Sequence, residues 1–113
     1  MIDGWIVQLR KGVLEYCLLL VLRRGESYGY EIVQALQGVE DLAVGESTVY
    51  PILSRLKGEG YLKSRDVRSE AGPKRRYFSL TAMGKVRLAE MSEYWPMLAN
   101  AIVQLKKQVG KGN

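Results

Sequence analysis

Histidine is absent from this 113-residue sequence, and cysteine occurs once, at Cys17. Without histidine, the chain lacks the usual general base at neutral pH and the commonest metal ligand of proteins. A single cysteine excludes an internal disulfide and a cysteine-rich zinc site, and no Ser–His or Cys–His pair can form within the chain. These absences predict that the protein is not an enzyme, binds no metal and needs no cofactor. Cys17 is expected to be a small buried apolar residue.

Long apolar runs are also missing. The longest run, residues 17–22, is far shorter than the about 20 residues that span a bilayer. Basic residues precede it, but Glu15 interrupts the apolar region and no small-residue cleavage site follows, which argues against a secretory signal. The sequence therefore predicts a cytoplasmic protein with no membrane partner, and its length fits one domain.

Positive charge is concentrated in one part of the chain. The whole sequence has 17 basic and 12 acidic residues, a net charge of +5. Residues 46–87 hold ten basic and four acidic residues, a net charge of +6, so the remainder has a net charge of −1. A localised cationic segment is typical of nucleic-acid binding. A solvated face that happens to be basic is the alternative.

Apolar residues at spacings of three and four predict three helices in the first half of the chain. The first ends at a Gly25 stop and is apolar nearly all round, so we expect it to be buried on more than one side. Ser27 is the expected cap of the second helix. The third begins near Glu46 and ends at about Gly58.

A β-hairpin is predicted next, with strands at residues 61–67 and 75–80 joined by a turn-forming cluster. A final helix, capped by Thr81, should extend to about Gln108. The predicted fold class is mainly α with a small β-hairpin. It comprises a winged helix-turn-helix DNA-binding domain over residues 1–82, a C-terminal dimerisation helix over 83–109 and a disordered tail over 110–113.

The third helix is the candidate recognition helix, which would place donors in a major groove about 12 Å wide. Its non-core side chains are short hydroxyls, a phenol that reaches the DNA backbone, and basic groups. Alternatively, Ser47 caps the helix, Tyr50 packs and Arg55 is solvated. Three adjacent cations after the hairpin turn repel one another, and a polyanion would remove that repulsion; a solubility device is the alternative. The candidate DNA-binding residues are Ser47, Thr48, Tyr50, Ser54, Arg55, Lys57, Lys74, Arg75 and Arg76.

The last helix has apolar residues spaced 4, 3, 4, 3 and 4, as at the a and d positions of a heptad. This seam indicates a partner helix and hence a homodimer, whereas the alternative is packing against its own domain. Pro96 lies within the seam and should kink or break the helix, with a bend near Tyr94 and Trp95. The candidate dimerisation residues are Met91, Trp95, Leu98, Ile102 and Leu105.

A ligand site is predicted at the same seam. If the seam is the dimer axis, two copies of Trp95 approach each other, and side chains of the first helix wall the same space. An aromatic-lined cavity of this kind suits a small planar aromatic ligand, although Trp95 filling the interface is the alternative. The candidate ligand-binding residues are Leu9, Tyr16, Trp95 and Leu98.

Four segments of the sequence resemble the PadR family of transcriptional regulators. They are Tyr-Gly-Tyr-Glu-Ile at 28–32, Ser-Thr-Val-Tyr-Pro-Ile-Leu-Ser-Arg-Leu at 47–56, Gly-Tyr-Leu at 60–62 and Arg-Tyr-Phe-Ser-Leu-Thr-Ala-Met-Gly at 76–84. The resemblance covers about residues 10–105. The single C-terminal helix resembles that of the small PadR subfamily, and within it the LmrR-like branch.

The resemblance implies a winged-helix homodimer that represses its own or neighbouring genes from a near-palindromic operator. It also implies that the helix at 46–59 enters the major groove, and that Tyr50 and residues 74–76 meet the DNA backbone and minor groove. In the LmrR-like branch, the tryptophan matching Trp95 faces its symmetry mate across a ligand-binding pore. Pro96, directly after it, departs from the family pattern.

The sequence thus predicts a sequence-specific DNA-binding transcriptional regulator, a homodimeric repressor released by a small aromatic ligand at the dimer interface. Its predicted partners are double-stranded operator DNA, a second copy of itself and that planar ligand. The alternative is a winged-helix protein-interaction module that places the basic hairpin on an acidic protein, without specific DNA binding.

Overall fold

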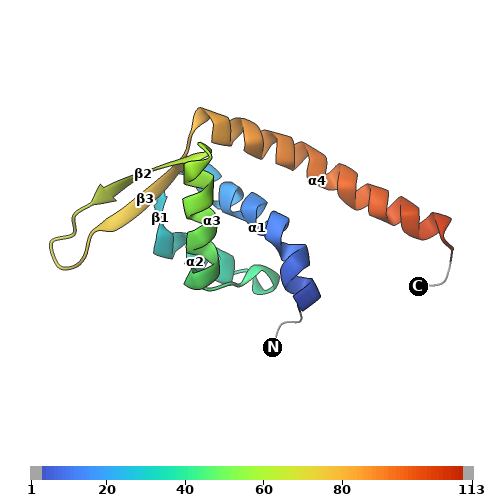
Figure 1. Ribbon diagram of the computed structural model, residues 1–113, viewed down its shortest axis with the longest axis horizontal. Coiled ribbons are helices and arrows are strands. Elements are labelled where there is room, and N and C mark those ends of the chain that lie inside the picture. The colour runs from blue at the N-terminus through green and yellow to red at the C-terminus, as the bar shows by residue number, and fades with distance from the viewer. Residues whose placement is uncertain (1–3, 111–113) are drawn as a thin grey trace.

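The computed structural model describes residues 4–110 and shows an elongated molecule, 61 × 35 × 22 Å. Three helices cluster together, a hairpin projects from one side, and a long helix extends from the other (Figure 1). This arrangement confirms the predicted mainly helical, winged helix-turn-helix fold class. The elements in chain order are α1 (Gly4–Arg23), β1 (Ser27–Tyr28), α2 (Gly29–Gln37), the short 3₁₀ helix η1 (Glu40–Leu42), α3 (Glu46–Gly58), β2 (Leu62–Val67), β3 (Arg75–Leu80) and α4 (Ala82–Gln108).

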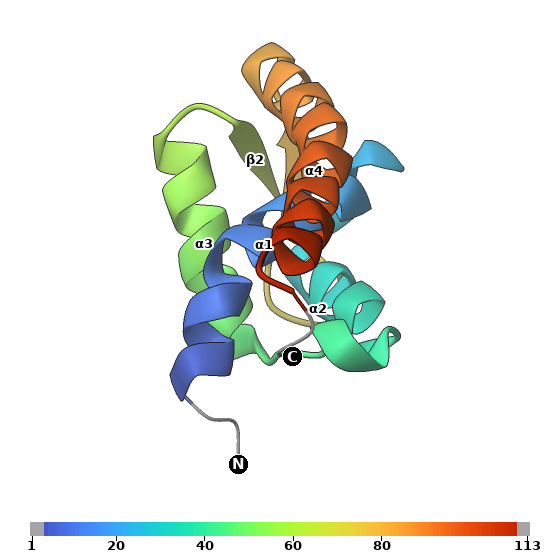
Figure 2. The ribbon, with the colours of Figure 1, turned by 90° about the vertical axis from the view of Figure 1, so that its right-hand side faces the viewer.

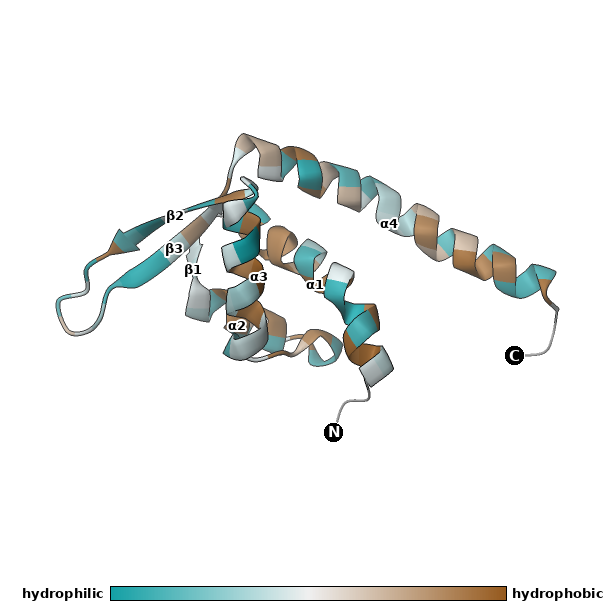
Figure 3. Cartoon of the chain, in the orientation of Figure 1, coloured by the Kyte–Doolittle hydropathy of each residue, from teal (hydrophilic) through white to brown (hydrophobic). Residues whose placement is uncertain are grey.

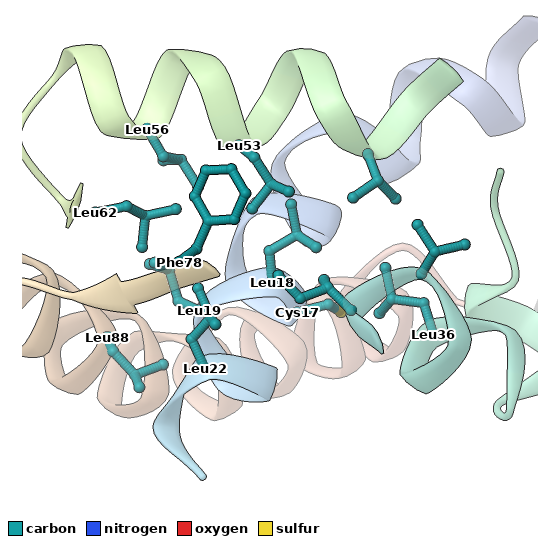
Figure 4. Packing of buried hydrophobic residues seen from close by; sticks show 13 residues of the cluster. Cys17, Leu18, Leu19, Leu22, Leu36, Leu53, Leu56, Leu62, Phe78 and Leu88 are labelled. Atoms are coloured by element: carbon teal, nitrogen blue, oxygen red, sulfur yellow. The ribbon is translucent and has the colours of Figure 1, made fainter. Parts of the chain in front are cut away.

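The hydrophobic core lies where α1, α2 and α3 meet the sheet (Figure 4). Leu18 of α1, Ile32 of α2 and Leu53 of α3 have no exposed surface, and Phe78 of β3 closes the cluster. Full burial of one such aliphatic side chain contributes roughly 1.5–3 kcal/mol. Cys17 is buried in the same cluster, as predicted, and burial raises the pKa of its thiol. The core therefore fixes α3 from its inner side and leaves its outer side free.

The sheet has three antiparallel strands in the order β1-β3-β2. Strands β2 and β3 form the predicted hairpin, with Leu62 opposite Leu80. Strand β1 was not predicted: Ser27 and Tyr28 pair with β3, so Ser27 is a buried strand residue and not the cap of α2. The backbone N–H of Tyr28 donates instead to the Glu31 carboxylate at 3.0 Å, which secures the start of α2. Tyr28 has extended backbone angles, so it both ends the strand and precedes the helix.

Thr81 caps α4, as predicted. Its hydroxyl accepts a hydrogen bond from the Gly84 N–H at 3.0 Å and donates to the Gly60 carbonyl at 2.6 Å. The Tyr61 carbonyl lies so close to Gly84 that a Cβ at that position would collide with it. These contacts join the end of α3 to the start of α4 and set the direction in which α4 leaves the domain.

Helix α4 continues without interruption through Pro96 (Figure 1). Of the two expected effects of this proline, a kink or a break, the break is therefore wrong, and the bend near Tyr94 and Trp95 stays a prediction. The missing N–H removes one hydrogen bond, to the carbonyl four residues earlier, while the helical bonds on either side remain available. The carbonyl left without this partner is that of Ser92, which is only partly buried, so water can solvate it.

The distal half of α4 extends beyond the other described elements, as Figure 3 shows, and in Figure 2 this half points toward the viewer. Apolar residues in this half are brown in Figure 3, and Ile102, Val103 and Leu105 are 47–57% exposed. No helix among the described residues is both long and apolar enough to cross a membrane. Apart from Gly110, the predicted disordered tail lies outside the described residues.

Candidate nucleic-acid interface

Helix α3 has one buried face and one exposed face. Val49, Leu53 and Leu56 face the core, and the six candidate DNA-binding residues of this helix are all exposed. The N-cap of α3 is Gly45, with no side-chain cap bond, so the alternative in which Ser47 caps the helix is wrong. The hydroxyl of Ser47 is thus available on the exposed face.

A cleft of about 660 Å³ separates α3 from the β2–β3 hairpin, which we call the wing. It brings together five of the nine candidate DNA-binding residues, three from the α3 side and two from the wing side. Those five are Tyr50, Ser54, Lys57, Lys74 and Arg76. Hydroxyl donors and cations therefore converge on one surface although they come from separate elements. Such donors are the groups that bind phosphate oxygens of nucleic acids.

Tyr50 is both packed and exposed. Its ring lies against Gly29 at the start of α2, so closely that any Cβ on Gly29 would collide with the ring. About 40% of Tyr50 nevertheless remains exposed. Burial raises the pKa of the Tyr50 phenol, and the nearby Glu46 carboxylate raises it further. The hydroxyl therefore stays protonated and can donate a hydrogen bond.

The two wing arginines lie on opposite faces of the sheet, because successive residues of a strand point to opposite sides. Arg76 lines the cleft and donates to Asp66 at 2.9 Å, which lowers the pKa of the Asp66 carboxyl. Arg75 lies over the Tyr28 ring, 4.8 Å from its centroid. The expected mutual repulsion of three adjacent cations is therefore reduced by this divergence and by Asp66.

A row of stacked side chains that sequence reasoning missed covers the outer face of the sheet. The Tyr28 and Tyr77 ring centroids are 5.4 Å apart, and Arg65 lies 5.6 Å from the Tyr77 centroid. Arg65 also donates twice to Glu26, at 2.7 Å each. The row links all three strands and so holds the wing against β1. The alternation of side chains along a strand could have placed Arg65 and Tyr77 on the same face of the sheet. The addition of Tyr28 to this row could not be predicted, because a two-residue strand has no recognisable sequence pattern.

Arg55 does not join the cleft. Its guanidinium donates to Glu15 of α1 at 2.9 Å and to Glu59 of α3 at 3.2 Å. These partners raise the pKa of Arg55, the Glu15 hydrogen bond having the largest effect. The structure therefore places this candidate DNA-binding residue in an ion-pair cluster on the α1 side of α3.

A second groove, of about 610 Å³, lies between α1 and α4. It brings together all four candidate ligand-binding residues, Leu9, Tyr16, Trp95 and Leu98. The Tyr16 hydroxyl donates to Ser92 Oγ at 3.2 Å and so ties the two helices at this groove. Trp95 is 45% exposed and Ile102 50% exposed in the single chain. The groove is apolar and open on the side where the distal half of α4 projects.

Comparison with known proteins identifies the family of this chain. The family described as "Transcriptional regulator PadR-like family" matches residues 18–90, more than half of the chain. The chain belongs to the PadR-like family. It is accordingly a DNA-binding transcriptional regulator, and its length is that of the small PadR proteins.

Solved structures of small PadR-like proteins match almost end to end. A PadR-like transcription factor from Bacteroides fragilis is 38% identical, with a TM-score of 0.79, over 92% of this chain and 100% of the other. A PadR-like regulator from Bacillus cereus is 35% identical, with a TM-score of 0.75, over 87% and 95% of the two chains. The architecture described above is thus the PadR-like fold throughout.

The structure of Bacillus subtilis PadR in complex with operator DNA is also similar. It is 31% identical, with a TM-score of 0.64, over 69% of this chain and 45% of that one. Our PadR-like chain thus matches less than half of the Bacillus subtilis protein.

Proposed function

We propose that this PadR-like protein is a homodimeric repressor that binds a near-palindromic operator. Helix α3 would lie in the major groove, and the wing would contact the DNA backbone and the minor groove. The observation that supports this proposal most is the cleft in which Tyr50, Ser54 and Lys57 of α3 face Lys74 and Arg76. The operator complex of Bacillus subtilis PadR, a relative of similar fold, supports it further.

The nine candidate residues divide by position. Ser47 and Thr48 lie at the exposed N-terminal end of α3, where short hydroxyls reach base edges or phosphates. The cleft residues would hold the phosphate backbone between α3 and the wing. Arg75 would contact DNA only after leaving the Tyr28 ring. Arg55 would do so only after leaving its carboxylates.

The proposed dimer forms through α4. In the single chain Trp95, Leu98, Ile102 and Leu105 are 37–57% exposed, although they form the a and d seam of a heptad. Met91, at the proximal end of the seam, packs against the core cluster of its own chain. Residues 1–82 would then be the DNA-binding domain and residues 83–109 the dimerisation helix. A two-fold dimer accounts for an operator with two half-sites.

The groove between α1 and α4 is the proposed ligand site. Its apolar walls and its aromatic side chains, Tyr16, Tyr94 and Trp95, suit a planar aromatic compound. A second copy of α4 on the open side would enclose it further. Ligand binding at this position would release the repressor by changing how the two α4 helices pack.

A DNA-binding titration tests the proposed function. Labelled fragments from upstream of the protein's own gene are titrated with the protein, with excess competitor DNA, at several salt concentrations. We expect saturable binding to one fragment that weakens steeply with salt, and weaker binding by Lys57→Ala than by the control Lys107→Ala on α4. Absence of binding to any duplex at low salt would refute the proposal and favour the protein-interaction module.

Transcription from the bound fragment tests the regulatory direction. Adding the protein to an in vitro transcription reaction on that fragment should lower the transcript level, because a repressor on its operator blocks the promoter. An increased transcript level would refute repression while leaving DNA binding intact.

A further inference from the structure

Among the candidate DNA-binding residues of α3, Arg55 alone forms ion pairs with two carboxylates in the described part of the chain. Its Nη2 atom bonds Glu15 at 2.9 Å, and its Nη1 atom bonds Glu59 at 3.2 Å. The Arg55 side chain is still 47% exposed, on the outer side of the recognition helix. A cation at this position is thus within reach of solvent and engaged by the protein itself.

The two carboxylates differ in origin. Glu59 is four residues after Arg55 on the same stretch, a local pair of the kind that contributes only about 0.2–0.5 kcal/mol and rearranges easily. Glu15 comes from α1, forty positions away in the chain, and its side chain is only 15% exposed. A carboxylate held in place by a packed helix is the more persistent of the two partners.

The charge balance on α3 is consequently asymmetric. On the wing side, Arg76 has one acidic partner, Asp66, and Lys57 and Lys74 add further positive charge around the cleft. On the α1 side, the cluster of Arg55, Glu15 and Glu59 has a net charge of −1. A DNA phosphate approaching this cluster would meet its two carboxylates, and Arg55 could bind the phosphate only by leaving Glu15.

We propose that Glu15 lowers the affinity of this protein for DNA by competing with a DNA phosphate for Arg55. Glu15 is a positioning residue that acts through Arg55 and does not itself touch the DNA. The inference rests on the proposed function, since it concerns the strength of the same α3–DNA contact. Guanidinium binds phosphate and carboxylate with the same fork of N–H donors, so the two anions exclude each other.

The test is the Glu15→Gln variant, assayed by fluorescence anisotropy on one labelled duplex from 50 to 200 mM salt. Each Arg55 that gains a phosphate should tighten binding and steepen the log–log salt slope by about 0.9, so that the gain in affinity is roughly threefold larger at 50 mM than at 200 mM salt. Glu90→Gln is the matched control, because it removes the same charge from another Arg–Glu pair, Arg87–Glu90, which lies on α4 and not on α3 or the wing. It should change neither quantity comparably.

A double-mutant cycle separates contact from simple charge removal. In an Arg55→Gln background, Glu15→Gln should no longer tighten DNA binding. The Arg55→Gln substitution should also lower the DNA affinity of the wild type less than it lowers the affinity of the Glu15→Gln variant. Glu15→Asp keeps the charge but shortens the side chain, so it should also tighten binding. Thermal unfolding of each variant identifies any that fail to fold, and Glu15→Asp then serves in place of Glu15→Gln.

The outcomes are distinguishable. Wild-type binding together with unchanged or weaker binding by Glu15→Gln and Glu15→Asp would refute the inference alone. Tighter binding by Glu15→Gln that persists in the Arg55→Gln background would also refute it, since the effect would then be one of net charge. Failure of the wild type and of every variant to bind any duplex would refute the proposed function itself.

Discussion

At the scale of single residues, the interface depends on close contacts that fix where each side chain can point. Tyr50 rests against Gly29, where no larger residue would fit, and so its hydroxyl is held at the edge of the cleft. Arg75 and Arg76 are neighbours in sequence, but one stacks on Tyr28 and the other faces α3. Adjacent residues of the wing therefore have different expected roles.

Arg76→Ala should weaken DNA binding more than Arg75→Ala. Arg76 already lies in the cleft with Asp66 as an exposed, exchangeable partner, whereas Arg75 must first leave the Tyr28 ring. We expect Arg76→Ala to reduce the salt slope by about 0.9 per lost phosphate contact, for all duplex sequences alike. Anisotropy titrations over a salt series measure this, and equal slopes for both variants and the wild type would show that the wing does not bind DNA.

At the scale of elements, the wing and α4 are both fixed at their bases and free at their ends. Strand β1 and the stacked outer row hold the base of the wing. The Thr81 cap and the close approach of Gly84 to Tyr61 hold the base of α4. Beyond these contacts, both elements extend away from the core (Figure 1). Their distal parts are therefore accessible to a binding partner.

Pro96→Ala should stabilise the protein. Proline in a helix interior is about 3 kcal/mol less favourable than alanine, and Pro96 lies inside an unbroken α4. We expect a higher midpoint of thermal unfolding by circular dichroism, at equal protein concentration, with the exposed neighbour substitution Met97→Ala as control. An unchanged or lower midpoint would show that the distal half of α4 does not unfold together with the rest.

At the scale of the whole molecule, the single chain leaves too much apolar surface uncovered along α4. Helix α1 covers only the proximal part of that helix, through Tyr16 and its bond to Ser92. The seam residues Trp95, Leu98, Ile102 and Leu105 are 37–57% exposed. Apolar residues along the projecting helix are brown in Figure 3. The heptad spacing of this surface supports the proposed dimer, in which a second copy would cover it.

Ile102→Asp should convert the proposed dimer into a monomer without unfolding the winged-helix part. The side chain is 50% exposed in the single chain, so the charge is tolerated there but would be buried between two α4 helices. Asn100→Asp introduces the same charge away from the seam and should leave the dimer intact. Sedimentation velocity measures the mass, and an unchanged mass for Ile102→Asp would contradict dimerisation through this seam.

A planar aromatic dye should quench the fluorescence of Trp95 through the groove between α1 and α4. Trp95 lines that groove, whereas Trp5 is 67% exposed and does not. Titration with an acridine dye should therefore quench Trp5→Phe nearly as strongly as the wild type, and Trp95→Ala only weakly. Equal quenching of Trp95→Ala, through Trp5, would remove the support for this ligand site.

Sequence patterns predicted the four α-helices and the hairpin, because each of these elements has a periodicity of its own. They did not predict the 3₁₀ helix η1, which is only three residues long. They missed β1, because a two-residue strand has no periodicity and exists only by pairing with β3. They grouped Arg55 with the candidate DNA-binding residues, because the helical spacing predicts its exposed position on α3. The spacing does not reveal that Glu15 of α1 forms an ion pair with Arg55. The four candidate ligand-binding residues line one groove between α1 and α4, and ligand binding at the dimer interface stays a prediction.

The sequence by itself determined the order of elements, the cationic character of residues 46–87 and the apolar seam of α4, since all three follow from residue type and spacing along the chain. Only the tertiary structure decided which cationic side chains are engaged by neighbouring residues and which face the cleft. Packing of α1 against α3 brings a carboxylate to Arg55, and strand pairing directs Arg75 and Arg76 to opposite faces. Whether an exposed charge can meet DNA depends on its nearest neighbours in space, and these come from distant parts of the chain.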